Sequence, residues 1–334
     1  MELSIGVVTV TYGNRWRFLQ KVLERVLAFP QVKVVVVVDN ASDYSVADAI
    51  RVFNDSRIKV ISEAENKGSA GGYKDGISEA VNSSNADLIW LLDDDNLPKR
   101  DAAELLLSAW EKIEGNSTSK ALFCFRADRL PHLRIAKGQN PHDYYLVPDN
   151  FMGFHVLRIV KNKLRKARNA EVDRMPIQPF VKMPYVPYGG FFMHRDMVKL
   201  IGTPNADFFV YADDSEYTYR VTKNGGSIWL VSAAEVIDID PSQGNNYKAG
   251  FLRSPLLDLW NFRTYYQVRN RIYFYSRASV RNRILYKINQ FLFMAQLFLS
   301  ATLTGKIKAY KGFKAAVEAG HRGKLGKVDP IPGT

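Results

Sequence analysis

Uninterrupted apolar runs alternate with helical patterns along roughly the first 100 residues of the chain. The apolar runs are 3–11, 32–38, 57–62 and 87–92. Helical patterns lie between them, from about Arg15 to Ala28, from about Ser45, and after the glycine-rich stretch GSAGGYKDG. The runs lack the alternation of strands that face water on one side, so they predict strands buried on both faces. We therefore expect an α/β fold with a doubly wound sheet.

The pattern is less regular in the rest of the chain. Residues 161–175 are rich in Lys and Arg and predict a solvated or mobile basic helix. The stretches 186–196 and 208–220 resume apolar runs with polar interruptions. From about Leu256 the chain becomes aromatic and basic, and the apolar spacing predicts a long helix over 281–302.

Composition narrows the class of protein. The 334 residues are enough for a large core, and the apolar and charged fractions are those of a globular protein. The lone Cys124 excludes an intramolecular disulfide and a cysteine-rich zinc site. The N-terminal residues MELSIGVVTV have no basic region or cleavage pattern, so we expect no secretion signal.

Positive charge is concentrated towards the C-terminus. The net charge is +12, and residues 248–334 contain 16 Lys and Arg against 3 Asp and Glu. Such a segment indicates a negatively charged partner, either nucleic acid or an anionic membrane surface.

The stretch WLLDDDNLP ends a predicted strand with Asp93, Asp94 and Asp95. Adjacent carboxylates repel one another, so something positive is expected beside them. Clustered carboxylates suit Mg²⁺ or Mn²⁺, which are held by one or two of them together with substrate phosphates. The alternative is a turn, with Asn96 and Pro98 as turn residues and Asp95 capping the next helix.

Two further polar stretches follow predicted strands and can converge with the carboxylates at the carboxyl ends of the sheet, where such folds bind ligands. Asp39 could accept from a base N–H or a ribose hydroxyl, or could belong to a helix-entry turn. The stretch 66–72 could bring backbone N–H groups against phosphate. It does not match GxxxxGK[ST], and no GxGxxG follows the first strand, which disfavours a P-loop and a nicotinamide cofactor.

The order of six motifs resembles that of family 2 glycosyltransferases: TVTYGNR, VVVVDNAS, NKGSAGGYKDGI, WLLDDDNLP, YGGFFMHRD and YADDSEYTYR. The resemblance covers roughly residues 3–240. It implies a GT-A fold with a Rossmann-like mixed sheet, a nucleotide-diphosphate sugar donor (a UDP-sugar above all), Mg²⁺ or Mn²⁺, and inversion at the anomeric carbon. The likeness is greatest to bacterial galactofuranosyltransferases and rhamnosyltransferases of polysaccharide synthesis, such as those that build O-antigen or capsule.

The resemblance also implies roles for individual residues. Asp95 is expected to ligate the metal, and Asp93 or Asp94 to lie nearer the ribose and sugar, with Asp93 also a metal candidate. Asp214 is the expected general base, and Glu216 either orients the acceptor or only pairs with Arg220. The remaining donor-binding positions implied by the resemblance are Thr11, Tyr12, Arg15, Asp39, Asn66, Gly68, Gly189 and Gly190.

The sequence departs from the family pattern after the acidic motif. Many relatives carry a late His that helps to hold the metal, but IWLVSAAEVIDIDP offers only Asp238 and Asp240. Asp238 is a candidate metal ligand in its place, Asp240 is the alternative, and a water molecule is a third.

The basic C-terminal segment predicts attachment to a membrane. The apolar stretch 284–303 barely reaches the length of a spanning helix and has polar interruptions, so a helix lying on the surface fits better. Alternatives are a core helix and a homodimer contact, whereas nucleic acid binding is disfavoured by the preceding motifs. We expect a cytoplasmic protein, peripheral on the inner face of the cell membrane, that acts on a lipid-linked oligosaccharide.

The expected organisation is a catalytic domain at 1–247 followed by a helical, basic, membrane-associating region at 248–334. The catalytic domain would comprise a nucleotide-binding half at about 1–98 and an acceptor half at about 99–247. Two other functions stay open, a nucleotidyltransferase and a catalytically dead nucleotide- or glycan-binding scaffold. The first is disfavoured because no early glycine-rich, basic nucleotide loop follows the first strand, and the second because Asp93, Asp95 and Asp214 are intact.

Overall fold

The computed structural model describes residues 3–167, 169–240 and 253–334. The chain forms two compact units, the first from Met1–Pro141, Val172–Ala206 and Asp214–Gln243, and the second from His142–Glu171, Asp207–Asp213 and Gly244–Thr334. The predicted boundary between 247 and 248 lies outside the described residues, and the predicted division into domains stays a prediction. The predicted division is a single cut in the sequence, so it does not include the segments 142–171 and 207–213, which belong to the second unit.

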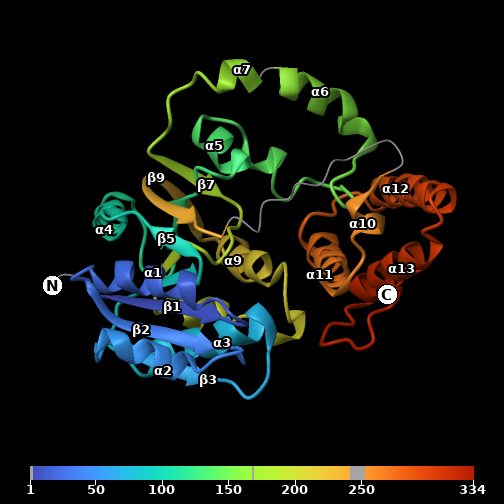
Figure 1. Ribbon diagram of the computed structural model, residues 1–334. Helices are drawn as coiled ribbons and strands as arrows, with labels where there is room; N and C mark the ends of the chain where they lie inside the picture. The colour runs from blue at the N-terminus through green and yellow to red at the C-terminus, as the bar shows by residue number, and fades with distance from the viewer. Residues whose placement is uncertain (1–2, 168, 241–252) are drawn as a thin grey trace. The chain divides into compact units, whose positions relative to one another are not determined.

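A mixed sheet forms the centre of the first unit (Figure 1). Its strands follow the order β3-β2-β1-β4-β8-β6-β9-β5, and β7 also pairs with β9. The first four are mutually parallel, whereas β8 is antiparallel to β4 and β6. The strands are β1 (Ile5–Thr11), β2 (Val32–Asp39), β3 (Ile58–Ser62), β4 (Leu88–Asp93), β5 (Asn96–Pro98), β6 (Lys120–Phe125), β7 (Phe180–Met183), β8 (Phe191–His194) and β9 (Ser227–Asp238).

The described residues of the two units also form helices. They are α1 (Trp16–Leu27), α2 (Val46–Ile50), α3 (Gly68–Asn82), α4 (Ala102–Lys112), α5 (Leu130–Ala136), α6 (Ile159–Ala167), α7 (Asn169–Val172), α8 (Met197–Ile201), α9 (Asp213–Lys223), α10 (Pro255–Asp258), α11 (Phe262–Ala278), α12 (Arg283–Leu303) and α13 (Ile307–Arg322). Short 3₁₀ helices are η1 (Arg51–Phe53), η2 (Pro141–Asp143), η3 (Val156–Arg158) and η4 (Ala206–Phe208). The predicted α/β class, with a doubly wound mixed sheet and C-terminal helices, is confirmed.

The two faces of the parallel strands are covered by different helices. Leu19 and Val22 of α1 share a core cluster with Val35 and Val37 of β2. Because side chains alternate along a strand, the neighbouring valines point to the opposite face. That face is covered by α3, and both faces are therefore dry, as the uninterrupted apolar runs predict.

The glycine-rich stretch belongs to α3 itself, so the prediction that it precedes a helix is wrong. The helix begins at Gly68, and Gly72 and Gly76 face the sheet. A Cβ atom on Gly72 would lie 2.6 Å from Cγ1 of Val10, and one on Gly76 would lie 2.6 Å from Cγ1 of Val8. The glycines therefore allow a close helix–sheet approach, which outweighs their weak helix propensity.

The second unit has a core of its own, built from α11, α12 and α13 with Phe151. The predicted long helix is α12, and it contributes Tyr286, Leu297 and Ala301 to this core. Its opposite face is exposed, with Ile284 73% and Phe291 70% accessible. The helix therefore packs along one apolar face and leaves a second apolar face uncovered within its unit.

A polar anchor inside the second unit holds the segment that precedes α9. The side-chain amide of Asn270 donates to the backbone carbonyls of Phe208, Val210 and Tyr211, at 2.8, 2.8 and 3.0 Å. Tyr211 has a φ of 69° and the following Ala212 one of 59°, in the left-handed region that such residues rarely adopt. The two N–H groups of the amide are shared among these three carbonyls, and they hold the segment that leads into α9.

Candidate active site

The three consecutive carboxylates lie where β1, β2 and β4 end together. The strand register pairs Thr11 with Asp39 and Val10 with Asp93. Asp94 and Asp95 form the turn between β4 and β5. Asp95 does not cap the next helix, because β5 follows it, so that part of the turn alternative is wrong.

A guanidinium group supplies the expected positive charge. Arg15, which directly precedes α1, contacts three carboxylates: Nε lies 2.8 Å from Asp94 Oδ1, Nη2 lies 2.5 Å from Asp95 Oδ2, and Nη1 lies 2.8 Å from Asp240 Oδ2. Thr11 Oγ1 donates to the second oxygen of Asp94 at 2.7 Å. Tyr12 is exposed, with its ring 5.8 Å from the guanidinium carbon of Arg15. The structure thus brings Thr11, Tyr12, Arg15, Asp94 and Asp95 together.

The carboxylates of this turn outnumber Arg15, the arginine that contacts them, and their pKa values are raised. Burial raises the pKa of Asp93, Asp94 and Asp95 to about 6 each, and the neighbouring carboxylates add to this rise. Hydrogen bonds and arginines act in the opposite direction but do not cancel it. Burial acts to lower the pKa of Arg15, but its acidic partners outweigh burial and raise that pKa. The site therefore carries uncompensated negative charge that a second cation would relieve.

The donor atoms fit a hard divalent cation. In the described part of the chain, no three Asp, Glu, His or Cys side chains form a ready-made metal cage. Mg²⁺ and Mn²⁺ sites of nucleotide enzymes do not require one, since one or two carboxylates and the substrate phosphates suffice. The raised pKa values of Asp93 and Asp95 and their oxygen-only chemistry match that arrangement.

Asp93 also belongs to a second polar group. Its Oδ1 accepts from the hydroxyl of Tyr73 at 2.8 Å. A Cβ atom on Gly189 would lie 2.8 Å from its Oδ2 and 1.7 Å from Asn96 Oδ1, so only glycine fits there. Gly190 follows with a φ of 108°, which also favours glycine. Of the two glycines predicted to form a tight turn, Gly189 therefore packs directly on the acidic turn, whereas Gly190 packs against Cys124 of β6.

The end of β2 forms a rim that holds the predicted nucleotide loop. Asp39 Oδ1 accepts from the N–H of Ser42 at 2.9 Å. Asn40, which sequence reasoning missed, is buried and donates to the carbonyl of Gly68 at 3.0 Å and to Asn66 Oδ1 at 3.2 Å. Asn66 Oδ1 in turn accepts from the N–H of Gly68 at 2.8 Å. Asn40 thereby ties Asn66 and Gly68 to the strand end that carries Asp39.

Asp214 lies in the first turn of α9 and is close enough to Asp93 that its charge raises the Asp93 pKa. Burial raises the pKa of Asp214 itself, although hydrogen bonds from the N–H and hydroxyl of Ser215, at 2.5 and 3.0 Å, oppose the rise. Glu216 instead pairs with Arg220 at 3.0 and 2.6 Å. The geometry therefore favours the alternative in which Glu216 only pairs with Arg220.

The two late aspartates point to different partners. Asp238 Oδ2 contacts Arg126 at 3.2 Å and Arg129 at 3.0 Å. Asp240 contacts Arg15 and is 5% exposed, so it joins the acidic turn, whereas Asp238 is bound by two arginines. Asp238 also lies near the acidic turn, because its charge raises the pKa of Asp95, so both aspartates stay candidates to replace the family's late His. Arg126 follows the end of β6, and the rule that ligands bind at strand ends could have found it.

One comparison by sequence identifies a family segment. Residues 6–118 match the family model described as Glycosyl transferase family 2. This is about a third of the chain, and it contains the acidic turn, Arg15 and the Asn40 rim. The predicted resemblance is confirmed for that segment, while the galactofuranosyl or rhamnosyl type stays a prediction. A search of curated proteins finds no match.

Solved structures share the fold at low sequence identity. A GalNAc-T7 crystal structure with UDP, GalNAc and Mn²⁺ aligns with a TM-score of 0.53 and 16% identity, covering 82% of this chain and 50% of that chain. The chain thus matches about half the length of GalNAc-T7. Residues 1–349 of TarS from S. aureus, in complex with UDP-GlcNAc, align with a TM-score of 0.50 and 15% identity, covering 94% of this chain and 82% of that chain. These likenesses show the fold, which is that of GT-A glycosyltransferases.

Proposed function

We propose that the protein is an inverting glycosyltransferase that moves a sugar from a nucleotide-diphosphate sugar to a hydroxyl acceptor. The observation that carries the proposal is the convergence of Arg15, Asp94 and Asp95 at the ends of β1 and β4, with Asp214 close to Asp93. The family match of residues 6–118 and the GT-A fold support the same activity. UDP in the GalNAc-T7 structure and UDP-GlcNAc in the TarS structure favour a UDP-sugar as donor.

The residues divide the work of an inverting transfer. Asp95, with Asp93 or Asp240, would hold Mg²⁺ or Mn²⁺, and that ion supplies charge stabilisation for the departing diphosphate. Asp39 and the Asn66–Gly68 loop would line the nucleoside. Asp214 would accept the proton of the acceptor hydroxyl as its oxygen attacks the anomeric carbon. A raised pKa suits this role, because it makes the carboxylate a stronger base.

To test the proposal, purified protein is incubated with each of a set of nucleotide sugars, and the products are identified by mass spectrometry. We expect a nucleoside diphosphate and a glycosylated acceptor, with UDP-galactofuranose and a rhamnose donor as the first compounds to try. Release of inorganic pyrophosphate would indicate nucleotidyl transfer instead. If no donor is consumed or hydrolysed with metal present, the dead-scaffold alternative replaces the proposal.

The second unit supports attachment to an anionic membrane, with a lipid-linked bacterial glycan as acceptor. By length and composition alone, α12 could cross a membrane, and it is the one such helix in the described part of the chain. Its inner face, however, packs in the core of its unit through Tyr286 and the buried Asn289. A helix whose other face is exposed and apolar, with Arg281, Arg283 and Lys308 nearby, suits the surface of the membrane better than its interior.

We expect the protein to sediment with vesicles that contain phosphatidylglycerol and to bind phosphatidylcholine vesicles less well. Reversing Arg281, Arg283, Lys287 and Lys308 to Glu should abolish sedimentation, because each nearby cation contributes about 1 kcal/mol. High salt should release part of the bound protein. Lys306 is left unchanged because it pairs with the buried carboxylate of Asp258.

Two variants separate apolar from electrostatic attachment. Phe291→Asp should weaken binding to both kinds of vesicle, whereas Val52→Asp, at an equally exposed apolar position in the first unit, should leave it unchanged. Resistance to salt combined with a need for detergent would indicate a spanning helix. Equal vesicle binding by all variants would contradict the surface attachment.

A further inference from the structure

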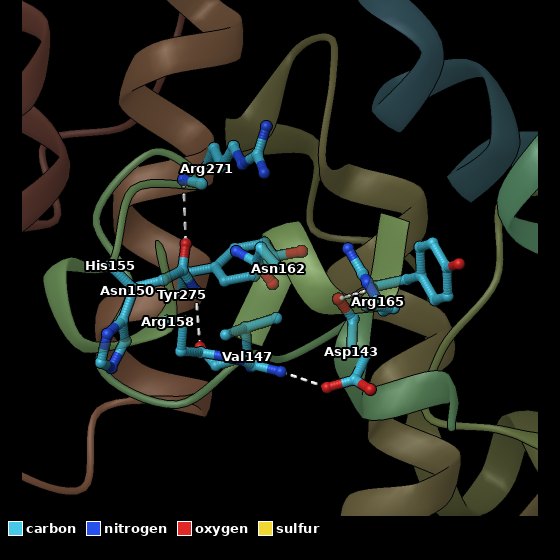
Figure 2. A pocket seen from close by; sticks show the side chains of 11 residues that line it. Asp143, Val147, Asn150, His155, Arg158, Asn162, Arg165, Arg271 and Tyr275 are labelled. Carbon is cyan, nitrogen blue, oxygen red and sulfur yellow. Dashed lines mark hydrogen bonds and ion pairs between the residues drawn. The ribbon is translucent and has the colours of Figure 1, made fainter. Parts of the chain in front are cut away.

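The second unit contains a pocket of about 190 Å³ that the proposed function does not use. Figure 2 shows its lining, contributed by η2, η3, α6, α11 and the loop between η2 and η3. Three arginines line it, Arg158, Arg165 and Arg271, against one carboxylate, Asp143. A pocket with this excess of guanidinium groups favours an anion.

The single carboxylate of the pocket is already compensated. Arg158 forms an ion pair with Asp143, and Lys161 lies 3.0 Å from the same oxygen. Arg165 donates to the backbone carbonyl of Asp143 at 2.9 Å. Burial acts to raise the pKa of Asp143, but the surrounding cations outweigh burial and lower it. Asp143 therefore stays ionised and orients two arginines without neutralising the pocket.

Arg271 is the cation with the most capacity left. It is half-buried on α11, and among the described residues it has no carboxylate within ion-pair distance. Its guanidinium carbon lies 5.3 Å from the ring centre of Tyr275, a cation–π contact that holds the side chain without satisfying its N–H groups. In Figure 2 the Arg271 side chain lies apart from Asp143. Five N–H donors of a half-buried guanidinium are thus available for an anion such as phosphate.

The elements that line the pocket also carry exposed apolar side chains. Leu157, Val160 and Leu164 are 72%, 67% and 61% accessible, and their spacing of three and four residues places them on one face. The N–H of Val156 donates to the side chain of the buried Asn289 at 2.9 Å, which fixes the start of η3 against the inner face of α12 and leaves the apolar face of η3 and α6 uncovered. An anion pocket bordered by an uncovered apolar surface matches a ligand with a charged head and an aliphatic tail.

We propose that this pocket binds the phosphate or diphosphate of a lipid, with the guanidinium of Arg271 on the phosphate oxygens and the alkyl chain on the exposed apolar residues of η3 and α6. The proposal rests on the proposed function, because the lipid phosphate would be the part of a lipid-linked acceptor that the second unit holds. The headgroup chemistry is a terminal phosphate, which also occurs in free pyrophosphate, and the test separates the two sources.

The test measures binding of farnesyl diphosphate and of inorganic pyrophosphate by calorimetry, with no nucleotide sugar present. The protein should bind farnesyl diphosphate more tightly than pyrophosphate, because only the former covers apolar surface. Arg271→Ala should weaken farnesyl diphosphate binding by about tenfold or more, as expected when a charge-assisted hydrogen bond is lost. Arg263→Ala, which removes the same charge from an exposed position on the same helix, should have no such effect.

Each outcome bears on the proposal. Equal affinity of Arg271→Ala and Arg263→Ala, both folded by thermal unfolding, would overturn it. Equal affinity for the two ligands would overturn the lipid and leave a free-phosphate site. Binding that depends on Arg271 in a protein that consumes no nucleotide sugar would keep the pocket and remove the proposed function. Glycosyl transfer without farnesyl diphosphate binding would keep the proposed function and overturn the lipid pocket.

Discussion

Turnover should fall by roughly 10²–10⁴-fold in the Asp214→Asn variant, the range typical of losing a general base. The amide is nearly isosteric but cannot take the acceptor proton. Donor affinity should change little, because Asp214 acts on the acceptor. Steady-state kinetics with varied donor and acceptor measures both quantities.

The pH profile of the same enzyme provides a second readout. The base works when deprotonated, so activity should rise with pH through the pKa of Asp214. Since burial raises that pKa, the acid limb should lie at higher pH than the usual value of about 3.9 for Asp. The limb should vanish in Asp214→Asn.

Glu216→Gln is the matched control, since Glu216 lies two residues after Asp214 in the same acidic motif. Its carboxylate pairs with Arg220, and a pair of this kind on a helix contributes about 0.3–0.5 kcal/mol, so turnover should stay near that of the unaltered protein. Equal losses in donor binding and turnover in Asp214→Asn would indicate that Asp214 is structural.

Removal of divalent cations should reduce transfer to background, and Mn²⁺ or Mg²⁺ should restore it. Asp95→Ala should lose activity at any metal concentration that supports the unaltered protein. The fold should survive, because Arg15 keeps Asp94 and Asp240 as partners. Circular dichroism and thermal unfolding check the fold, and a nucleotide-release assay with metal-depleted protein checks activity. Full activity after thorough chelation would contradict the proposal that Asp95 holds a divalent cation needed for transfer.

The first four strands and the position of the acidic turn could be predicted because both depend on local pattern. Uninterrupted valine runs such as 34–38 indicate burial on both faces, and a polar residue at the end of such a run must lie at the sheet edge. The pairing of Arg15 with Asp95 and Asp240 could not be predicted, since it joins three distant parts of the chain. The same limit explains why Asn40 and Arg126 were missed.

The glycines of α3 show a different limit. Glycine is a weak helix former, and local propensity therefore indicates a loop at 68–76. The neighbouring strand explains why glycines stand in this helix, because Val8 and Val10 lie so close to it that they leave no room for a Cβ atom. The partnership of residues 142–171 with α11 and α12 is likewise invisible to local patterns, since it depends on contacts between segments more than 100 residues apart, such as Val156 with Asn289.

The interleaved path of the chain has a consequence for recombination between genes. The second unit takes segments 142–171 and 207–213 from within the stretch that builds the first unit. A crossover near residue 247 would exchange α11, α12 and α13 but leave behind the carbonyls of Phe208 and Val210 that Asn270 holds. Chimaeras between relatives should therefore survive only when these internal segments are inherited together with the C-terminal helices, so the specificity of the two units is expected to evolve as one linked block.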